Sequence, residues 1–268
     1  MPDGPRKLRF LRHFVLIFTV GAAADDRDPV HYAFASYLGN GFYSGADRDV
    51  FVLNVPFKVD PKGGTWAPYQ FRLPVSVGFF DFDFLDAPEN VPESVATMTF
   101  IPGIERRFQL SDSWSLTPYV DLGVGYNFST DLASTIYSTG VAAELEFGGN
   151  HAWVSRVFYA GYYTPANHDS NDFGAFQTGV ELSVATFALF GRDVRLAPFA
   201  MGYWYFDALK FIRPGQSAAD VVTNGEVGVS LIFEQPISLI VAKIPRVALS
   251  YRFGDGVSAW RIVFSRPI

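Results

Sequence analysis

One short string in this sequence brings together residue types that could perform catalytic chemistry. It is Asn167-His-Asp-Ser-Asn-Asp172, and the carboxylate of Glu181 follows ten residues beyond Asn171. In an extended chain His168 and Ser170 share one face, whereas Glu181 is an odd number of residues from both and falls on the opposite face. Because Asn, Asp and Ser gather in loops, the alternative interpretation is a polar external loop with no catalytic role.

The string is similar to the His-x-Ser-Asn motif of outer-membrane lipid A deacylases. The resemblance implies that Ser170 is the nucleophile and that His168 is the base that activates it. It further implies that Asn171 helps to hold the oxyanion and that Glu181 orients the histidine. The motif of that family lies on a strand, whereas the composition here predicts a loop.

A second candidate site consists of charged residues that fall on the polar faces of alternating segments. Both signs are well represented among them. Two interpretations follow: a selective pore, or a network of ion pairs that fills a narrow barrel. The residues expected to line the interior are Arg72, Glu105, Arg107, Glu144, Glu146, Arg156, Glu181, Arg195, Glu226, Arg246, Arg252 and Arg261.

Other kinds of chemistry find little support in the composition. The chain has 4 His and 0 Cys, which removes disulfides, thiol catalysis and cysteine metal ligands. No two histidines have metal-ligand spacing, so we expect no metal and no cofactor. The Gly-x-Gly at 123–125 lies within a strand pattern and not at a strand–helix turn, so it predicts no phosphate loop. The net charge of −6 makes nucleic acid an improbable partner.

These residues must be positioned by β-strands, because hydrophobicity alternates with a period of two through most of the chain. In 69–79 the apolar face carries Tyr69, Phe71, Leu73, Val75, Val77 and Phe79. In 114–126 it carries Leu116, Pro118, Val120, Leu122 and Val124, and the opposite face carries Ser115, Thr117, Tyr119 and Asp121.

Three features favour a membrane barrel over a soluble β-protein. The predicted strands have about 10–14 residues, against about 5–6 in typical soluble strands. Aromatic residues bracket the apolar face: Trp114 and Tyr126 are separated by roughly 30 Å along the membrane normal at about 3.3 Å per residue and about 40° tilt. The polar faces combine Gly, Ser and Thr with charges, as the interior of such a barrel does.

The predicted fold is therefore all-β: a single closed antiparallel transmembrane β-barrel of about twelve strands. An even number of strands leaves both termini on the periplasmic side. Turns near 111–112, 148–150 and 189–192 are expected there, and longer external loops near 81–94, 165–172 and 207–221. The predicted strands are 30–39, 50–59, 69–80, 95–109, 113–127, 135–147, 151–164, 173–187, 193–206, 222–233, 245–253 and 257–265.

The first 24 residues differ from the rest of the chain and predict a signal peptide. Four basic residues between 6 and 12 precede the apolar stretch 14–20, and Gly21-Ala-Ala-Ala24 fits cleavage before Asp25. The apolar stretch is too short to span a bilayer as a helix. The expected domains are thus a signal peptide, 1–24, and an outer-membrane β-barrel domain, 25–268.

The order of strands also resembles the solitary outer-membrane autotransporter β-barrel family. The segments that carry this resemblance are 50–57, 71–80, Ile101-Pro-Gly-Ile-Glu105 and Pro118-Tyr-Val-Asp-Leu-Gly123. It implies a twelve-stranded barrel without the large passenger domain of ordinary autotransporters. Barrels of this kind usually end on an aromatic residue, whereas Ser265-Arg-Pro-Ile268 follows Phe264 here.

The sequence therefore predicts a non-enzymatic bacterial outer-membrane barrel, either structural or a pore that translocates solutes. Its expected partners are outer-membrane lipids and the barrel-insertion machinery. A lipid A acyl hydrolase that uses His168 and Ser170 is the alternative function. A secreted soluble β-barrel that binds a ligand is a third.

Overall fold

The computed structural model describes residues 40–45, 48–80, 97–128, 130–189, 191–211, 219–238, 243–255 and 257–264. Its regular elements are β1 Gly41–Gly45, β2 Arg48–Val59, β3 Gln70–Phe80, β4 Thr97–Phe100, β5 Gly103–Glu105, β6 Phe108–Gln109, β7 Trp114–Asn127, β8 Leu132–Phe147, β9 His151–Thr164, β10 Asp169–Glu181, β11 Ala185–Leu189, β12 Arg192–Phe211, β13 Ala219–Ser238, β14 Lys243–Gly254 and β15 Val257–Val263. Among the described residues no helix has the length and hydropathy to cross a membrane.

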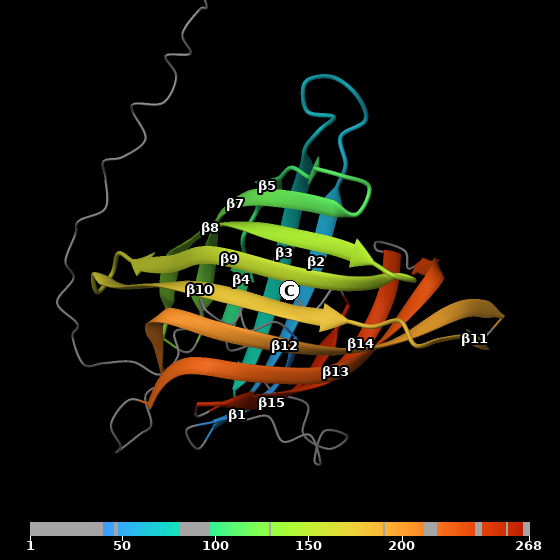
Figure 1. Ribbon diagram of the computed structural model, residues 1–268. Coiled ribbons are helices and arrows are strands. Elements are labelled where there is room, and N and C mark those ends of the chain that lie inside the picture. Colours follow the sequence, from blue (N-terminus) through green and yellow to red (C-terminus); the bar gives the residue numbers. More distant parts are fainter. Residues whose placement is uncertain are drawn as a thin grey trace, which may run out of the picture.

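The strands form one antiparallel sheet that closes on itself. Neighbouring strands pair in the order β10-β9-β8-β7-β4-β3-β2-β1-β15-β14-β13-β12, and β12 pairs in turn with β10. The pieces β4, β5 and β6 occupy one position between β3 and β7, and β11 continues β10 along β12, so the fifteen elements make twelve strand positions. Figure 1 shows β8–β10, β12 and β13 in front, with β2 and β3 crossing behind them. The predicted fold class and strand number are confirmed.

Closure satisfies backbone groups that an open sheet would leave unpaired. The ring is completed by β1, which pairs with β2 on one side and with β15 on the other. It is completed elsewhere by seven consecutive pairs between β10 and β12, from Ala175↔Tyr205 to Glu181↔Phe199. In a bilayer core no water is present to bond a free strand edge, so only such a closed sheet is stable there.

Side chains alternate between the two faces of the wall, and the apolar face is the outer one. On β7, Val120, Leu122 and Val124 are exposed, while Tyr119 and Asp121 are buried. A soluble barrel would show the reverse, because the hydrophobic effect drives apolar side chains away from water. The apolar exterior, together with interior polar and charged side chains such as Asp121 and Glu226, makes this a barrel of the transmembrane type.

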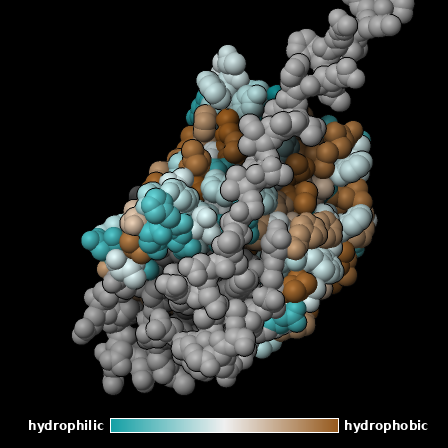
Figure 2. All heavy atoms as spheres, turned by 90° about the vertical axis from the view of Figure 1, so that its left-hand side faces the viewer, coloured by the Kyte–Doolittle hydropathy of each residue, from teal (hydrophilic) through white to brown (hydrophobic). Residues whose placement is uncertain are grey.

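The outer surface has aromatic residues near both ends of the barrel. Trp114, Phe147 and Trp153 lie exposed near one end, and Tyr163, Phe206 and other aromatic residues lie near the opposite end. Large apolar side chains such as Val157 and Val229 are exposed on the strands between them. Figure 2 shows hydrophobic residues over much of the wall and a smaller group of hydrophilic residues at one side. Two aromatic bands that flank an apolar belt are typical of a barrel matched to a bilayer.

Several local expectations differ from the structure. The segment 165–172 is a four-residue turn, 165–168, followed by β10, and not a long loop. The strand expected at 95–109 is in three pieces, since Ile101-Pro102 and Arg106-Arg107 interrupt it, and the strand expected at 173–187 breaks at 182–184. The expected strand 30–39 and the signal peptide 1–24 lie outside the described residues, and the first described strand is β1.

The two ends of the barrel are not equivalent. Because the number of strand positions is even, β1 begins and β15 ends at the same end, together with the connections after β2, β6, β8 and β11. We call this the terminal end and the other the distal end. In the distal turn 165–168 the side-chain oxygen of Asn167 accepts a hydrogen bond from the backbone N–H of Asp169 at 3.2 Å. His168 adopts the left-handed backbone conformation that reverses the chain, with a φ of 59°.

Candidate functional site in the barrel interior

The structure places eleven of the twelve sequence-predicted charges on the inward register of their strands, whereas Arg107 lies in the break between β5 and β6. Only some of the twelve lie together. Arg72 and Glu105 meet near Tyr119, Arg156 reaches the same tyrosine, and Glu181 meets Arg246. Glu226, Arg252 and Arg261 form a further group. Arg107 pairs with Glu144, Arg195 pairs with Glu234, and Glu146 lies exposed near the terminal end.

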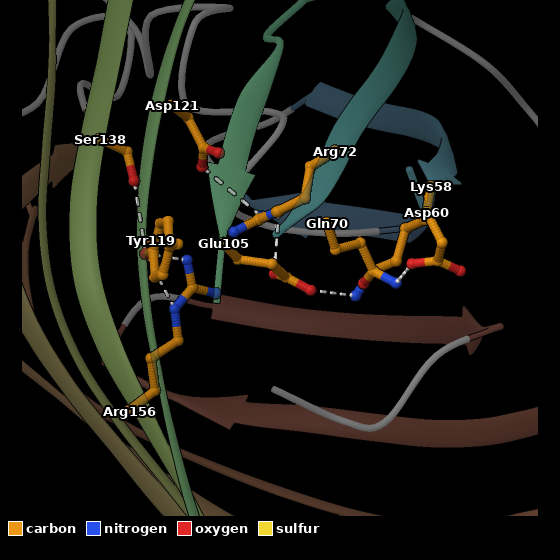
Figure 3. A network of polar contacts seen from close by, with 9 residues as sticks. All are labelled: Lys58, Asp60, Gln70, Arg72, Glu105, Tyr119, Asp121, Ser138 and Arg156. Carbon is orange, nitrogen blue, oxygen red and sulfur yellow. Dashed lines mark hydrogen bonds and ion pairs between the residues drawn. The ribbon is translucent and has the colours of Figure 1, made fainter. Parts of the chain in front are cut away.

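The first group is centred on Tyr119 of β7, and we call it the Tyr119 cluster: Lys58, Arg72, Glu105, Tyr119, Asp121 and Arg156. Lys58 donates to Glu105 at 2.6 Å, while Arg72 lies 3.6 Å from Glu105 and 3.5 Å from Asp121. Arg156 donates from Nε to the Tyr119 hydroxyl at 3.0 Å. Figure 3 shows side chains from β2, β3, β5, β7 and β9 converging here. The cluster thus ties together strands that are far apart in the sequence.

Two glycines make room for this cluster. Gly140 lies opposite Tyr119 on β8, and a Cβ at Gly140 would lie 2.9 Å from the Tyr119 ring and 2.6 Å from the Val157 carbonyl oxygen. Gly103 lies opposite Asp121, and a Cβ there would collide with the Asp121 carboxylate. The tyrosine ring and the carboxylate therefore lie against the wall because their cross-strand partners have no side chains.

The second group, the Glu226 cluster, is buried. Its members are Tyr203, Glu226, Ser250, Arg252 and Arg261, from β12 to β15. Glu226 accepts hydrogen bonds from Tyr203 at 2.5 Å, from Ser250 at 2.6 Å and from Arg261. The Arg252 guanidinium lies 4.1 Å from the centre of the Tyr203 ring. A carboxylate with no solvent exposure is tolerable only when its oxygens are bonded in this way.

Glu181 and Arg246 form a third, smaller contact near the terminal end. Arg246 donates to Glu181 at 2.7 Å, and the Ser230 hydroxyl donates to the same oxygen at 2.8 Å. Both charged side chains are buried. Because the donors come from β13 and β14 and the acceptor from β10, the contact holds three strands at a fixed spacing across β12.

The interior is therefore unequal around its circumference. Beside β9, β10 and β12 it is packed with apolar and aromatic side chains, which are Phe158, Phe173, Phe199, Met201, Tyr203 and Tyr205. On the opposite side, beside β2, β3 and β5, Lys58 is 49%, Arg72 21% and Glu105 14% exposed. The Tyr119 cluster is thus more exposed to water, at Lys58 and Arg72, than the buried Glu226 cluster.

The candidate catalytic string does not form a site. On β10, Glu181 points inward with Phe173 and Ala175, whereas Ser170 has the opposite, outward register. Ser170 and Glu181 are also separated by roughly 36 Å along one strand, at about 3.3 Å per residue. The His168 Nδ1 lies 3.1 Å from the Tyr163 hydroxyl. Asn171 has the inward register, away from Ser170, so neither Glu181 nor Asn171 lies where the motif would need it beside the serine.

Ser170→Ala is accordingly expected to leave the cell's lipid A unchanged. A hydrolase of this kind needs its nucleophile within about 2.6–3.2 Å of its base, and the base within similar reach of the orienting carboxylate. Strand β10 holds Glu181 far from both His168 and Ser170. Mass spectrometry of lipid A from cells that express the wild type or the variant provides the test. An acyl chain that disappears only with the wild type would contradict this expectation.

Some interior residues were missed by the sequence analysis as site residues. Asp121 and Tyr119 were assigned to the polar face of 114–126 but to no site, although their parity already placed them on the inner face of the wall. Lys58 shares its inward parity with Asn54 and could have been found in the same way. Tyr203 could not have been identified from parity, because both faces of 196–206 are apolar or aromatic. Among the described residues no group of three His, Cys, Asp or Glu is arranged to hold a metal ion.

Comparison with known proteins finds similarity only among solved structures. No family model matches the chain, and no curated protein matches it. One similar structure is the NanC porin, with 12% identity, a TM-score of 0.43, and coverage of 83% of this chain and 94% of that chain. Another is the KdgM porin in complex with disordered oligogalacturonate, with 8% identity, a TM-score of 0.41, and coverage of 83% and 93%.

These findings correct the family expected from the sequence. The resemblance to solitary autotransporter barrels was wrong, because the solved structures that match are porins and no family model supports the autotransporter assignment. Three of the four segments that carried the resemblance, 50–57, 71–80 and 118–123, are ordinary alternating strands, and such strings recur in many barrels. The fourth, 101–105, contains the break between β4 and β5. The low identities and TM-scores carry no argument about a solute.

Proposed function

We propose that this chain is a bacterial outer-membrane β-barrel whose interior forms a narrow, polar pore. The observation that supports the proposal is the inverted distribution of side chains: apolar residues are exposed on the wall, and charged residues line the inside. Twelve strand positions lie between the filled eight-stranded barrels and the wide porins. The partial exposure of Lys58, Arg72 and Glu105 supports a solvent path beside β2, β3 and β5.

The proposal includes the location and the partners. The terminal end is expected to face the periplasm, because barrels with an even number of strands keep both termini there. Outer-membrane lipids would contact the exposed apolar belt, and the barrel-insertion machinery would assemble the sheet. Export by cleavage after residue 24 remains a prediction, which N-terminal sequencing of the membrane-extracted protein can test.

Planar-bilayer recording provides the test of the pore. Folded protein, identified by a heat-dependent change of gel mobility, is expected to give discrete current steps smaller than those of sixteen-stranded porins, because packed side chains narrow the interior. A folded barrel that inserts but stays silent contradicts the pore and leaves a structural barrel held by its ion pairs. A water-soluble protein without heat-dependent mobility contradicts the membrane barrel itself.

A further inference from the structure

Two arginines from different strands lie against one tyrosine in the barrel interior. The Arg72 guanidinium carbon is 4.5 Å and the Arg156 guanidinium carbon 4.7 Å from the centre of the Tyr119 ring. Figure 3 shows Arg72 and Arg156 reaching this ring from different directions. Two cations held on one ring repel each other, and an anion beside them would relieve that repulsion.

The carboxylates of the Tyr119 cluster engage these arginines only weakly. Arg72 lies 3.6 Å from Glu105 and 3.5 Å from Asp121, longer than the about 2.7–2.9 Å of a charge-assisted hydrogen bond. Arg246, by contrast, lies 2.7 Å from Glu181. Arg156 has no ion pair within 4.0 Å among the described residues, and its hydrogen bonds go to the Tyr119 hydroxyl. The guanidinium groups therefore keep donors that can bind a ligand.

The charges of the Tyr119 cluster do not cancel. Its cations are Lys58, Arg72 and Arg156, and its carboxylates are Glu105 and Asp121, which leaves one positive charge. A monovalent anion would complete the balance. The planar guanidinium fork matches the two oxygens of a carboxylate, which favours an organic acid over a spherical ion such as chloride.

We propose that Arg72, Tyr119 and Arg156 form a binding site for the carboxylate of a small monovalent organic acid. The site rests on the proposed pore, because a solute must reach it through the barrel interior. Arg156 is the main contact, since no carboxylate of the cluster pairs with it directly. Tyr119 is a positioning residue whose hydroxyl accepts from the Arg156 Nε at 3.0 Å.

Binding of trifluoroacetate to the detergent-solubilised full chain, followed by the broadening of its ¹⁹F NMR signal, tests the site. Trifluoroethanol has the same fluorinated group without the charge and serves as the neutral control. Arg156→Gln is expected to weaken trifluoroacetate binding about tenfold or more. Arg156→Lys keeps the charge but loses the fork, so an intermediate affinity is expected.

Arg107→Gln is the matched control, because it removes one positive charge from an interior side chain that is 54% exposed and lies outside the cluster. It should leave the affinity unchanged. Tyr119→Phe keeps the ring but removes the hydroxyl that holds Arg156, so weaker binding is expected there too. This variant decides the question if Arg156→Gln fails to show heat-dependent gel mobility.

Three outcomes overturn the carboxylate site. The signal of trifluoroethanol broadens as much as that of trifluoroacetate; Arg107→Gln loses as much trifluoroacetate affinity as Arg156→Gln; or Arg156→Gln binds trifluoroacetate as tightly as the wild type. Current steps in planar bilayers without Arg156-dependent binding leave the pore standing and remove the site. Arg156-dependent binding by a barrel that gives no current steps in bilayers supports the carboxylate site and contradicts the pore. Failure of the site and failure of the proposed function are thus distinguishable.

Discussion

Arginine in place of Val120 is expected to destabilise the barrel in a lipid bilayer by about 2–4 kcal/mol, the cost of an arginine on the lipid face at the midplane. Val120 lies on the outer face of β7, where it is 52% exposed, and it is midway between Trp114 and Tyr126. Urea unfolding in phospholipid vesicles, followed by tryptophan fluorescence, measures the loss. The wild type and the variant must show equal heat-dependent gel mobility before unfolding.

Thr117→Arg is the control for this prediction. Thr117 has the opposite, inward register on the same strand and lies across from Ala142 of β8. An arginine there meets the polar interior and not lipid, so its cost should be much smaller. Equal losses for the two variants would show that the inward and outward faces of β7 have been assigned wrongly.

Glu226→Gln is expected to cost about 3–5 kcal/mol of unfolding free energy, the range for breaking a buried ion pair by removal of one partner. The substitution keeps the shape of the side chain but leaves the buried Arg261 without the carboxylate that it pairs with. Arg252, which also acts electrostatically on Glu226, loses a favourable neighbour as well. The same unfolding measurement in vesicles applies.

Two further variants show whether the loss arises from the unpaired charge. Arg107→Gln disrupts an ion pair of 3.4 Å whose arginine is largely exposed, and should cost less than about 1 kcal/mol. The double variant Glu226→Gln with Arg261→Gln should be more stable than Glu226→Gln alone, because it leaves no unpaired guanidinium at that position. A stability of Glu226→Gln within about 0.5 kcal/mol of the wild type would contradict a structural role for the Glu226 cluster.

The local pattern of the sequence determined which residues form strands and which face of each strand is apolar. The period of two is a property of an extended chain, so parity alone placed Arg72, Arg156 and Glu226 on the inner face. Strand β9 has the predicted bounds, His151–Thr164, because a short turn precedes it and another follows it at 165–168. Eleven of the twelve strand positions followed from the same pattern, whereas β1, Gly41–Gly45, was not predicted.

Local composition failed where pairing with a neighbouring strand outweighed it. The polar residues 169–172 predict a loop, yet they pair with Thr164, Tyr163, Tyr162 and Gly161 of β9 and extend β10 toward the distal end. The Tyr162 hydroxyl also donates to Asp169 at 2.9 Å. Hydrogen bonds from an adjacent strand satisfy the backbone whatever the side chains prefer, so context outweighs intrinsic propensity.

Which charges meet was decided only by the tertiary structure. Arg246 and Glu181 are 65 residues apart, Arg261 and Glu226 are 35 apart, and Arg156 and Tyr119 are 37 apart. Parity says that these side chains point inward, but the stagger between strands and the closure of the ring decide which of them lie at the same height. That stagger sets the long ion-pair distances around Tyr119 and the short ones around Glu226. Gly103 and Gly140 add to it by leaving space for the side chains of Asp121 and Tyr119 on β7.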